Sequence, residues 1–282
     1  MPEPLAPETY LPLVEAALAE DIGGGDATTL ALVPQDAIAT AAMVAREPLV
    51  MAGADLALAA FQQVDERVEF GIEIFDGQQA ALGQALLRVR GPACALLTAE
   101  RTALNFIQRL AGVATRTALY VEAVAGTGAT ILDTRKTTPG WRALEKYAVV
   151  CGGGTNHRVG LYDQMMIKDN HLAALDGDIA RAVALAREAS PGLKIEVEAD
   201  TVEQAAAAAA AGVDMILLDN MSGDELRDAV GQIGGRAKTE ASGGVTLETV
   251  RDIAGTGVDF ISVGALTHSA PSVDIGLDFD AG

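Results

Sequence analysis

Basic residues gather between positions 135 and 168 of a chain whose formal net charge is −19. Three of its five lysines fall in this segment, with three arginines and one histidine. Arginine binds carboxylates and phosphates through paired hydrogen bonds, and lysine adds a compact positive charge. We therefore expect a site for an anionic substrate, built from Arg135, Lys136, Arg142, Lys146, His157, Arg158 and Lys168. The alternative is a set of solvated charges that pair with Asp133, Glu145, Asp163 and Asp169.

Two carboxylates, Glu198 and Asp219, end neighbouring apolar runs of the sequence. If those runs are adjacent strands of one barrel, both side chains lie at its mouth, facing the basic cluster. Two ionised carboxylates there could stabilise a cationic transition state. They could equally bind ribose hydroxyl groups or a Mg²⁺ ion.

Three glycine-containing segments could bring backbone N–H groups close to an anion. Gly152–Gly154 leads into the basic residues, although a flexible turn would have the same composition. Ser242–Gly244 and Gly264–Ala265 each follow an apolar run. The loops after the last two strands of a barrel commonly bind phosphate. The simpler interpretation is a pair of tight strand-to-helix turns.

Six apolar runs after residue 128 end in polar residues, and helical stretches separate most of them, at 176–189, 201–211, 222–232 and 246–255. Strands that alternate with helices predict a parallel sheet, and functional residues at strand ends are typical of an α/β barrel. Because we count six or seven strands rather than eight, we expect an incomplete barrel. The runs are Thr130–Leu132, Met165–Ile167, Ile195–Glu198, Met215–Leu218, Lys238–Ala241 and Phe260–Val263.

The first 125 residues follow a different pattern. Helical spacing predicts helices at 8–20 and at 54–63. Apolar runs between turn signals predict a small sheet with strands at Ala39–Ala45, Val68–Phe75 and Ala85–Arg90. A longer helix is expected from Thr98 to about Ala125, with Thr98 as its N-cap.

Composition excludes several classes of protein. Hydrophobic residues make up 50% of the 282 residues but aromatic residues only 4%, so aliphatic side chains must fill the core. The acidic balance argues against a nucleic-acid partner. Cys94 and Cys151 predict neither a disulfide framework nor a metal site. Met1–Pro4 has no signal-peptide character, and the alanine-rich run at 204–211 is too short to span a bilayer. We expect a cytoplasmic enzyme with no membrane partner.

Several motifs, in order along nearly the whole chain, resemble quinolinate phosphoribosyltransferases. The central match is Leu132-Asp133-Thr134-Arg135-Lys136-Thr137-Thr138-Pro139-Gly140. The others are Glu20–Gly23, Gly25–Thr29, Glu100–Phe106, Leu144–Ala148, Gly152–Gly154, Asn156–Arg158, Ile167–His171, Glu240–Gly244 and Ile261–Ser269. Trp141 departs from the pattern, which usually has an aliphatic residue there, and could alter a local packing surface.

This resemblance implies an α/β fold of the type II phosphoribosyltransferase kind. An N-terminal α/β sandwich domain at 1–110, completed by 269–282, would precede an incomplete α/β barrel at 111–268. The family is at least dimeric, so the resemblance implies a homodimer or higher in which Arg101 reaches the active site of the partner subunit.

The resemblance also implies roles for individual residues. The two quinolinate carboxylates would be held by Arg135, His157, Arg158 and Lys168. The 5′-phosphate of phosphoribosyl pyrophosphate would be held by Ser242, Gly243, Gly244, Gly264 and Ala265. The catalytic residues would be Lys136, which contacts substrate or phosphate, and Glu198 and Asp219, which face the ribose. Mg²⁺ would arrive with phosphoribosyl pyrophosphate, and the protein itself would provide no separate metal site.

The expected reaction joins quinolinate to the phosphoribosyl group and releases carbon dioxide, giving nicotinate mononucleotide for NAD synthesis. Four alternatives stay open at this stage. They are phosphoribosylation of nicotinate, the related branch associated with molybdenum transport, Schiff-base chemistry at Lys168, and anion binding without catalysis. The intact segment Lys168–His171 argues against the molybdenum-associated branch, which usually departs from it.

Overall fold

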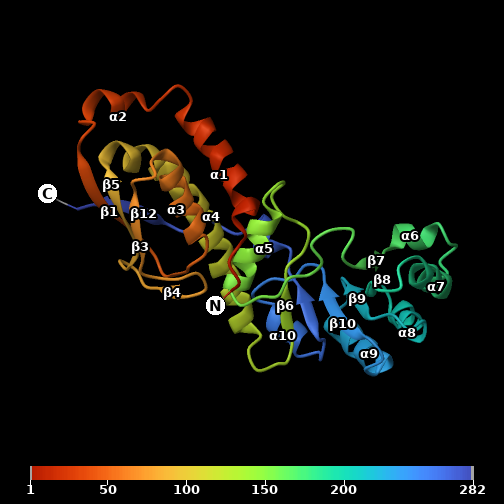
Figure 1. Cartoon of the computed structure of the whole chain (residues 1–282). Coiled ribbons are helices and arrows are strands. Elements are labelled where there is room, and N and C mark those ends of the chain that lie inside the picture. Colours follow the sequence, from red (N-terminus) through yellow and green to blue (C-terminus); the bar gives the residue numbers. More distant parts are fainter. Residues whose placement is uncertain (1, 281–282) are drawn as a thin grey trace. The chain divides into compact units, whose positions relative to one another are not determined.

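The computed structural model describes residues 2–280, which form two compact units. Unit 1 contains Met1–Ala118, Thr138–Gly153 and Ser269–Gly282. Unit 2 contains Leu119–Thr137 and Gly154–His268. Each unit has its own sheet, and each is described by itself (Figure 1).

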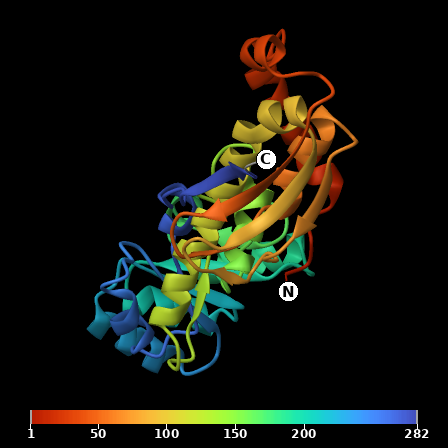
Figure 2. The same ribbon diagram turned by 90° about the vertical axis from the view of Figure 1, so that its left-hand side faces the viewer.

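Unit 1 is built on a four-stranded antiparallel sheet in the order β12-β1-β5-β3. The last strand of the chain pairs with the first, Ala45 opposite Ile275 and Ala41 opposite Phe279. Figure 2 shows this blue strand beside the red-orange β1. A short pair, β2 (Leu49–Val50) with β4 (Gln79–Ala80), lies outside this sheet. The strands of the sheet are β1 (Ile38–Ala45), β3 (Glu69–Ile72), β5 (Ala85–Pro92) and β12 (Ile275–Phe279).

The helices of unit 1 supply much of its core. Seven of the eleven residues of α3 are buried, from Ala54 to Phe61, which is the burial expected of a helix that is apolar on most sides. Trp141 stacks on Phe106 with ring centroids 5.0 Å apart, so this departure from the family pattern has a packing partner. The helices are α1 (Pro7–Ile22), α2 (Ala27–Leu32), α3 (Ala54–Val64), α4 (Ala93–Ala123) and α5 (Arg142–Cys151).

The expected N-cap at Thr98 is wrong. Helix α4 begins at Ala93, directly after strand β5, and Thr98 lies inside it. The residues between them, alanine, cysteine and leucine, suit a helix interior, so no polar residue marks its start. The Thr98 hydroxyl instead lies 3.3 Å from a carboxylate oxygen of Asp26, to which it donates.

Helix α5 groups with unit 1 by its contacts, whereas the sequence-based boundaries assigned residues 138–153 to the barrel. Glu145 of α5 is fully buried and accepts hydrogen bonds from Arg109 of α4. The Tyr147 hydroxyl donates to Asp76 over 2.8 Å. Contacts between residues so distant in sequence cannot be read from a motif match.

Unit 2 is an open parallel barrel of six strands in the order β6-β11-β10-β9-β8-β7. The expected incomplete barrel, of six or seven strands, is therefore confirmed, and it has six. Within the described residues no ladder joins β6 to β7, and β6 pairs on that side only with Thr155, by a single bridge. The strands are β6 (Thr130–Leu132), β7 (Met165–Ile167), β8 (Ile195–Ala199), β9 (Met215–Asp219), β10 (Lys238–Ser242) and β11 (Phe260–Ser262).

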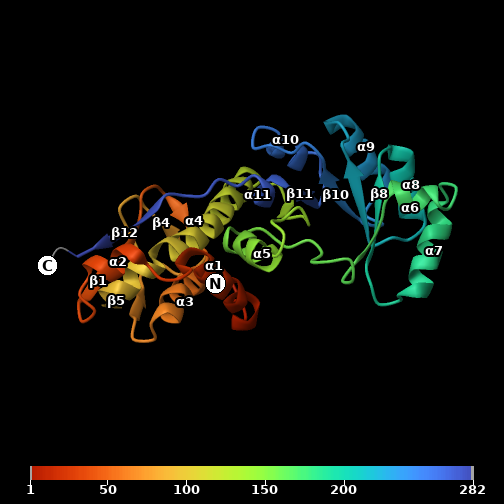
Figure 3. The same ribbon diagram turned by 90° about the horizontal axis from the view of Figure 1, so that it is seen from above.

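Helices cover the outer side of these strands (Figure 3). Local signals fix their ends: Ser222 and Glu225 form a capping box at the start of α9, and Gly234 ends that helix in the left-handed conformation. Among residues 2–280 no helix is both long and apolar enough to cross a membrane. The helices of unit 2 are α6 (Asp169–Ala173), α7 (Ile179–Ala189), α8 (Val202–Ala210), α9 (Gly223–Ile233), α10 (Val250–Ala254) and α11 (Ala265–His268).

Candidate active site

A cavity of about 500 Å³ lies at the carboxyl ends of the barrel strands. Every strand of unit 2 contributes to it, either with its last residues or with the loop that follows, and all of its lining residues belong to unit 2. The lining residues are Asp133, Thr134, Arg135, Lys136, His157, Arg158, Met166, Lys168, Glu198, Leu217, Asp219, Asn220, Glu240, Ser242, Gly243, Gly244 and Ser262.

Strand alternation explains which side chains reach the cavity. Residues two apart in a strand point to the same face of a sheet. In β9 these are Leu217 and Asp219, and in β10 they are Glu240 and Ser242. The same rule places Glu196 on the face of β8 that carries Glu198.

The structure brings together most of the residues that the sequence singled out. Ten of them line this one cavity: Arg135, Lys136, His157, Arg158, Lys168, Glu198, Asp219, Ser242, Gly243 and Gly244. Their order around the mouth follows the strand order and not the sequence, which is how distant motifs form one site.

The other expected residues lie elsewhere. Gly264 and Ala265 do not line the cavity, although a Cβ atom built on Gly264 would come within 3.0 Å of Lys136 Cδ. Arg101 is exposed on α4 and belongs to unit 1. Arg142 and Lys146 belong to α5, also in unit 1, so the basic residues close in sequence are divided between the units.

Two guanidinium groups lie near each other in the cavity. Burial and the positive charge of Arg135 lower the pKa of Arg158 below its ordinary value. The Arg158 guanidinium donates to the carbonyl oxygen of Gln164 at 3.4 Å and to Met166 Sδ at 3.5 Å. Two like charges held together at a cavity wall are typical of a site that binds an anion between them.

Lys168 and Glu198 face each other across the ends of β7 and β8, and the ammonium donates to the carboxylate. The Glu198 side chain is mostly covered, whereas the Lys168 side chain is 42% exposed. The cation at the end of one strand is thus held over the carboxylate at the end of the next. Each is available to a bound substrate if the pair separates.

The loop after α5 is pinned to strand β6. The backbone N–H of Thr155 donates to Ile131 O at 2.9 Å, and Thr155 O accepts from the N–H of Asp133 at 3.2 Å. The fully buried Asp133 carboxylate accepts the backbone N–H of His157 at 2.8 Å. These hydrogen bonds fix the loop so that His157 and Arg158 lie at the mouth of the barrel.

A buried cluster of His157, Glu196 and Glu240 lies beside the cavity. Nε2 of His157 is 3.0 Å from Glu196 Oε2 and 3.2 Å from Glu240 Oε2. Burial alone would lower the pKa of His157, but the two carboxylates outweigh it and raise the pKa to about 10. Burial in turn raises the pKa of Glu196 above its usual range. The cluster therefore retains protons that isolated side chains would lose.

Among residues 2–280 these three side chains are the one group of His, Cys, Asp or Glu residues with metal-ligand spacing. Nε2 of His157 lies within ion-pair distance of both carboxylates, so we interpret the group as a buried ion-pair cluster. The oxygen donors suited to a hard cation such as Mg²⁺ are instead Glu198 and Asp219, at the open mouth.

The turn after β10 has room only for glycine at Gly243. Its φ is +97°, and a Cβ atom there would lie 2.1 Å from Asn220 Oδ1. Asn220 follows β9, also has a positive φ of 55°, and donates its side-chain N–H to Asp219 Oδ2 at 2.6 Å. The glycine thus allows the loops after β9 and β10 to pack closely behind Asp219.

Sequence reasoning assigned no role to several residues of the site. Glu196 and Glu240 are charged residues inside otherwise apolar strands, and this pattern could have indicated that they belong to the site. Glu196 precedes Glu198 by two residues, so strand periodicity alone places both on one face. The lining residues without a predicted role are Asp133, Thr134, Met166, Leu217, Asn220, Glu240 and Ser262.

The fold and the site together define an α/β-barrel enzyme that acts on an anionic substrate at the carboxyl ends of its strands. Comparison with known proteins is more specific. The quinolinate phosphoribosyl transferase N-terminal domain matches residues 26–111, and the C-terminal domain of the same family matches residues 113–278. The chain belongs to the quinolinate phosphoribosyltransferase family.

Individual relatives resemble the chain over nearly its whole length. The nicotinate-nucleotide pyrophosphorylase (carboxylating) of Mycobacterium leprae is 49% identical, with 94% of this chain and 95% of that protein covered. A probable enzyme of the same name from Bacillus subtilis is 46% identical over 92% of this chain and 89% of its own. The solved nicotinate-nucleotide pyrophosphorylase of Francisella tularensis is 38% identical and superposes with a TM-score of 0.94, covering 98% of both chains.

Proposed function

We propose that this chain transfers the phosphoribosyl group of phosphoribosyl pyrophosphate to quinolinate, with loss of carbon dioxide. The products are nicotinate mononucleotide, pyrophosphate and CO2, in the synthesis of NAD. The observation that carries the proposal is that the family match spans nearly the whole chain and that the site residues expected from it gather in one cavity. Ten of the expected site residues line that cavity.

Quinolinate carries two adjacent carboxylates, and the cavity offers cations suited to both. Arg135 and Arg158 provide planar guanidinium groups that can each bind a carboxylate with two hydrogen bonds. Lys168 adds a third cation on the neighbouring strand end. Nicotinate has only one carboxylate, so this number of cations favours the dicarboxylate.

Other residues of the same cavity suit the phosphoribosyl substrate. Glu198 and Asp219 face the ribose in the proposed complex, where they stabilise the positive charge that develops on the sugar. The loop Ser242–Gly244 offers backbone N–H groups to the 5′-phosphate. Lys136 lies where it can neutralise phosphate charge. Glu198 and Asp219 are the oxygen donors that would hold a Mg²⁺ ion bound with the pyrophosphate, and such an ion would neutralise the charge of the leaving group.

The reaction needs no nucleophile from the protein. The pyridine nitrogen forms a bond to C1 of the ribose as the bond from C1 to pyrophosphate breaks. In the resulting pyridinium, the bond from the ring to the adjacent carboxylate breaks, and its electron pair stays on the ring carbon. CO2 leaves, and a proton takes its place. The protein orients the two substrates and places charge around them.

The proposal includes a homodimer or larger assembly in which Arg101 reaches the partner's site, and a cytoplasmic location. A mixing experiment tests the first part. Arg101→Ala and Lys136→Ala chains are each expected to be nearly inactive. Mixed assemblies should regain activity, because some sites then combine an intact Arg101 with an intact Lys136. No recovery after confirmed subunit exchange would contradict sharing of Arg101. Fractionation of the cell tests the location.

The central test uses the purified chain with phosphoribosyl pyrophosphate, Mg²⁺ and quinolinate labelled in the carboxylate that is lost. Equal amounts of labelled CO2 and nicotinate mononucleotide are expected. Nicotinate in place of quinolinate should give little product. Borohydride should trap no adduct at Lys168, because no Schiff base forms. A folded chain that binds quinolinate but releases no CO2 would contradict the proposed function.

A further inference from the structure

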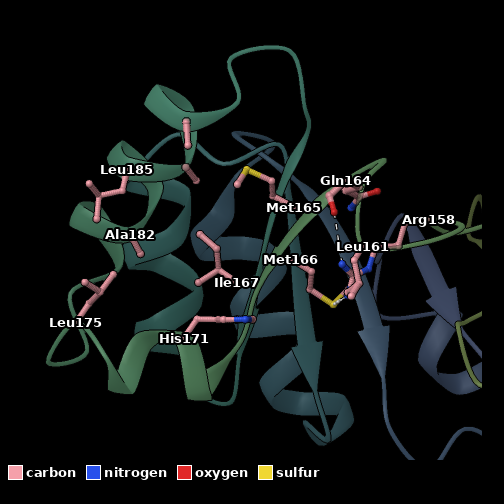
Figure 4. Close-up of a pocket in the computed structure, with 12 residues that line it drawn as sticks. Arg158, Leu161, Gln164, Met165, Met166, Ile167, His171, Leu175, Ala182 and Leu185 are labelled. Carbon is pink, nitrogen blue, oxygen red and sulfur yellow. Dashed lines mark hydrogen bonds between the residues drawn. The ribbon is translucent and has the colours of Figure 1, made fainter.

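Arg158 is held by both its backbone and its side chain, and both contacts lead to Glu196. Its backbone N–H donates to His157 Nδ1 at 2.7 Å, and its guanidinium donates to Gln164 O at 3.4 Å. The Gln164 side chain donates to Glu196 Oε2 at 2.9 Å, and the same oxygen lies 3.0 Å from His157 Nε2. Figure 4 shows Arg158 turned toward Gln164 and Met166.

Glu240 faces the same histidine from the other side of β9. Its Oε2 lies 3.2 Å from His157 Nε2, and its side chain is 1% exposed. Glu196 is fully buried. Asp219 ends β9 and Glu198 lies one residue before the end of β8. Glu240 lies two residues before the end of β10 and Glu196 three residues before the end of β8, so both are deeper in the barrel. Burying two carboxylates is costly, so they need a partner that supplies protons or charge.

We propose that Glu196 and Glu240 are positioning residues: they hold the His157 ring and, with Gln164, fix Arg158 for binding a substrate carboxylate. The proposal rests on the proposed function, because a displaced Arg158 would affect catalysis through the binding of quinolinate. It assigns His157 an indirect task. Its Nδ1 accepts a backbone N–H, and its Nε2 lies 3.0 and 3.2 Å from the two carboxylates.

The contact at Nδ1 also places the protons of the cluster. A backbone N–H can donate to Nδ1 only when that nitrogen has no proton, so the ring proton sits on Nε2, facing the carboxylates. The two carboxylates outweigh the effect of burial and raise the pKa of His157, which keeps that proton in place. The charged groups around the ring are Asp133, Glu196, Glu240 and Arg158.

The test compares Glu196→Gln and Glu240→Gln with Glu203→Gln, an exposed substitution of the same kind in α8. All three keep the side-chain volume. The KM for quinolinate is expected to rise about 10- to 100-fold in the first two variants, because small displacements of a binding group have effects of this size. The KM for phosphoribosyl pyrophosphate and the thermal midpoint should change little. Glu203→Gln should match the unsubstituted chain.

A second readout does not depend on activity. The chain has only three histidines, so 15N labelling of histidine gives a simple NMR spectrum. The His157 signals are those that are missing from the spectrum of His157→Gln. The unsubstituted chain should keep a proton on Nε2, the nitrogen that faces the carboxylates, throughout pH 6 to 9. Glu196→Gln should abolish that constancy.

The outcomes separate the two proposals. A fixed Nε2–H ring that is lost in Glu196→Gln, in a chain inactive on quinolinate, would leave the network standing and remove the proposed function. An active chain in which both glutamine variants keep the normal KM for quinolinate would overturn the positioning role. So would a His157 ring that exchanges freely between tautomers in the unsubstituted chain.

Discussion

Substituting Gly243 by alanine tests the close packing behind Asp219. The new Cβ atom would meet Asn220 Oδ1 at 2.1 Å, a distance at which the asparagine side chain must move. Moving it breaks the 2.6 Å hydrogen bond from Asn220 to Asp219. Gly244 provides a matched control, since its φ is also positive, at +60°, but a Cβ atom there meets nothing within 4 Å.

The magnitudes follow from these two differences. A left-handed backbone costs an alanine about 1–2 kcal/mol, and both variants incur that cost. Only Gly243→Ala also loses the hydrogen bond, worth about 0.5–1.5 kcal/mol. The free energy of unfolding should therefore fall by about 1–2 kcal/mol in Gly244→Ala and by about 1.5–3.5 kcal/mol in Gly243→Ala. For a chain of this size, the difference corresponds to a few degrees in the thermal midpoint.

Urea unfolding and kcat/KM for phosphoribosyl pyrophosphate are the assays. We expect Gly243→Ala to lower kcat/KM at least about tenfold, because Asp219 loses the group that orients it. Removing the obstructing side chain in Asn220→Ala/Gly243→Ala should recover stability relative to the sum of the two single effects. Equal stability of Gly243→Ala and Gly244→Ala, or purely additive effects in the double variant, would refute the reasoning.

Three further outcomes are expected. Glu145→Ala should lower the free energy of unfolding by about 3–5 kcal/mol, because it leaves the Arg109 guanidinium without the buried carboxylate that it contacts at 2.6 Å; urea unfolding measures this loss. Lys168→Met should raise the KM for quinolinate while the stability changes by less than about 1 kcal/mol, since the ion pair of Lys168 is partly exposed. Burial raises the pKa of the Cys151 thiol to about 12, so this thiol stays protonated at pH 8; iodoacetamide should modify the less buried Cys94 first, as mass spectrometry can show.

Periodicity and strand-end chemistry predicted most of the barrel. The run ending in Glu198 and the run ending in Asp219 are adjacent strands, and their carboxylates do line one cavity. This succeeded because a parallel sheet brings all carboxyl ends to the same edge, whatever the order of its strands. The start of α4 was missed because the sequence from Ala93 to Thr98 has no residue that separates strand from helix.

The buried cluster could not be predicted in the same way. Glu196 and Glu240 lie on strands that are separated by β9, and His157 reaches them from a loop that Asp133 anchors. The contact therefore depends on the sheet order, the register and the path of a loop, and none of these is set by residues near one another in sequence. The spacing of Glu196 and Glu198 indicates only a shared face.

The pairing of β12 with β1 has a consequence for synthesis on the ribosome. Strand β1 ends at Ala45, and its outer neighbour starts at Ile275, about 230 residues later. At the usual rates of translation the delay is roughly 10–50 s. During that time β1 is the edge of its sheet, with backbone groups open to pairing with another chain. All six barrel strands emerge before β12. A nascent chain stalled shortly before Ile275 is thus the species most exposed to misassembly, and the one that a chaperone would recognise.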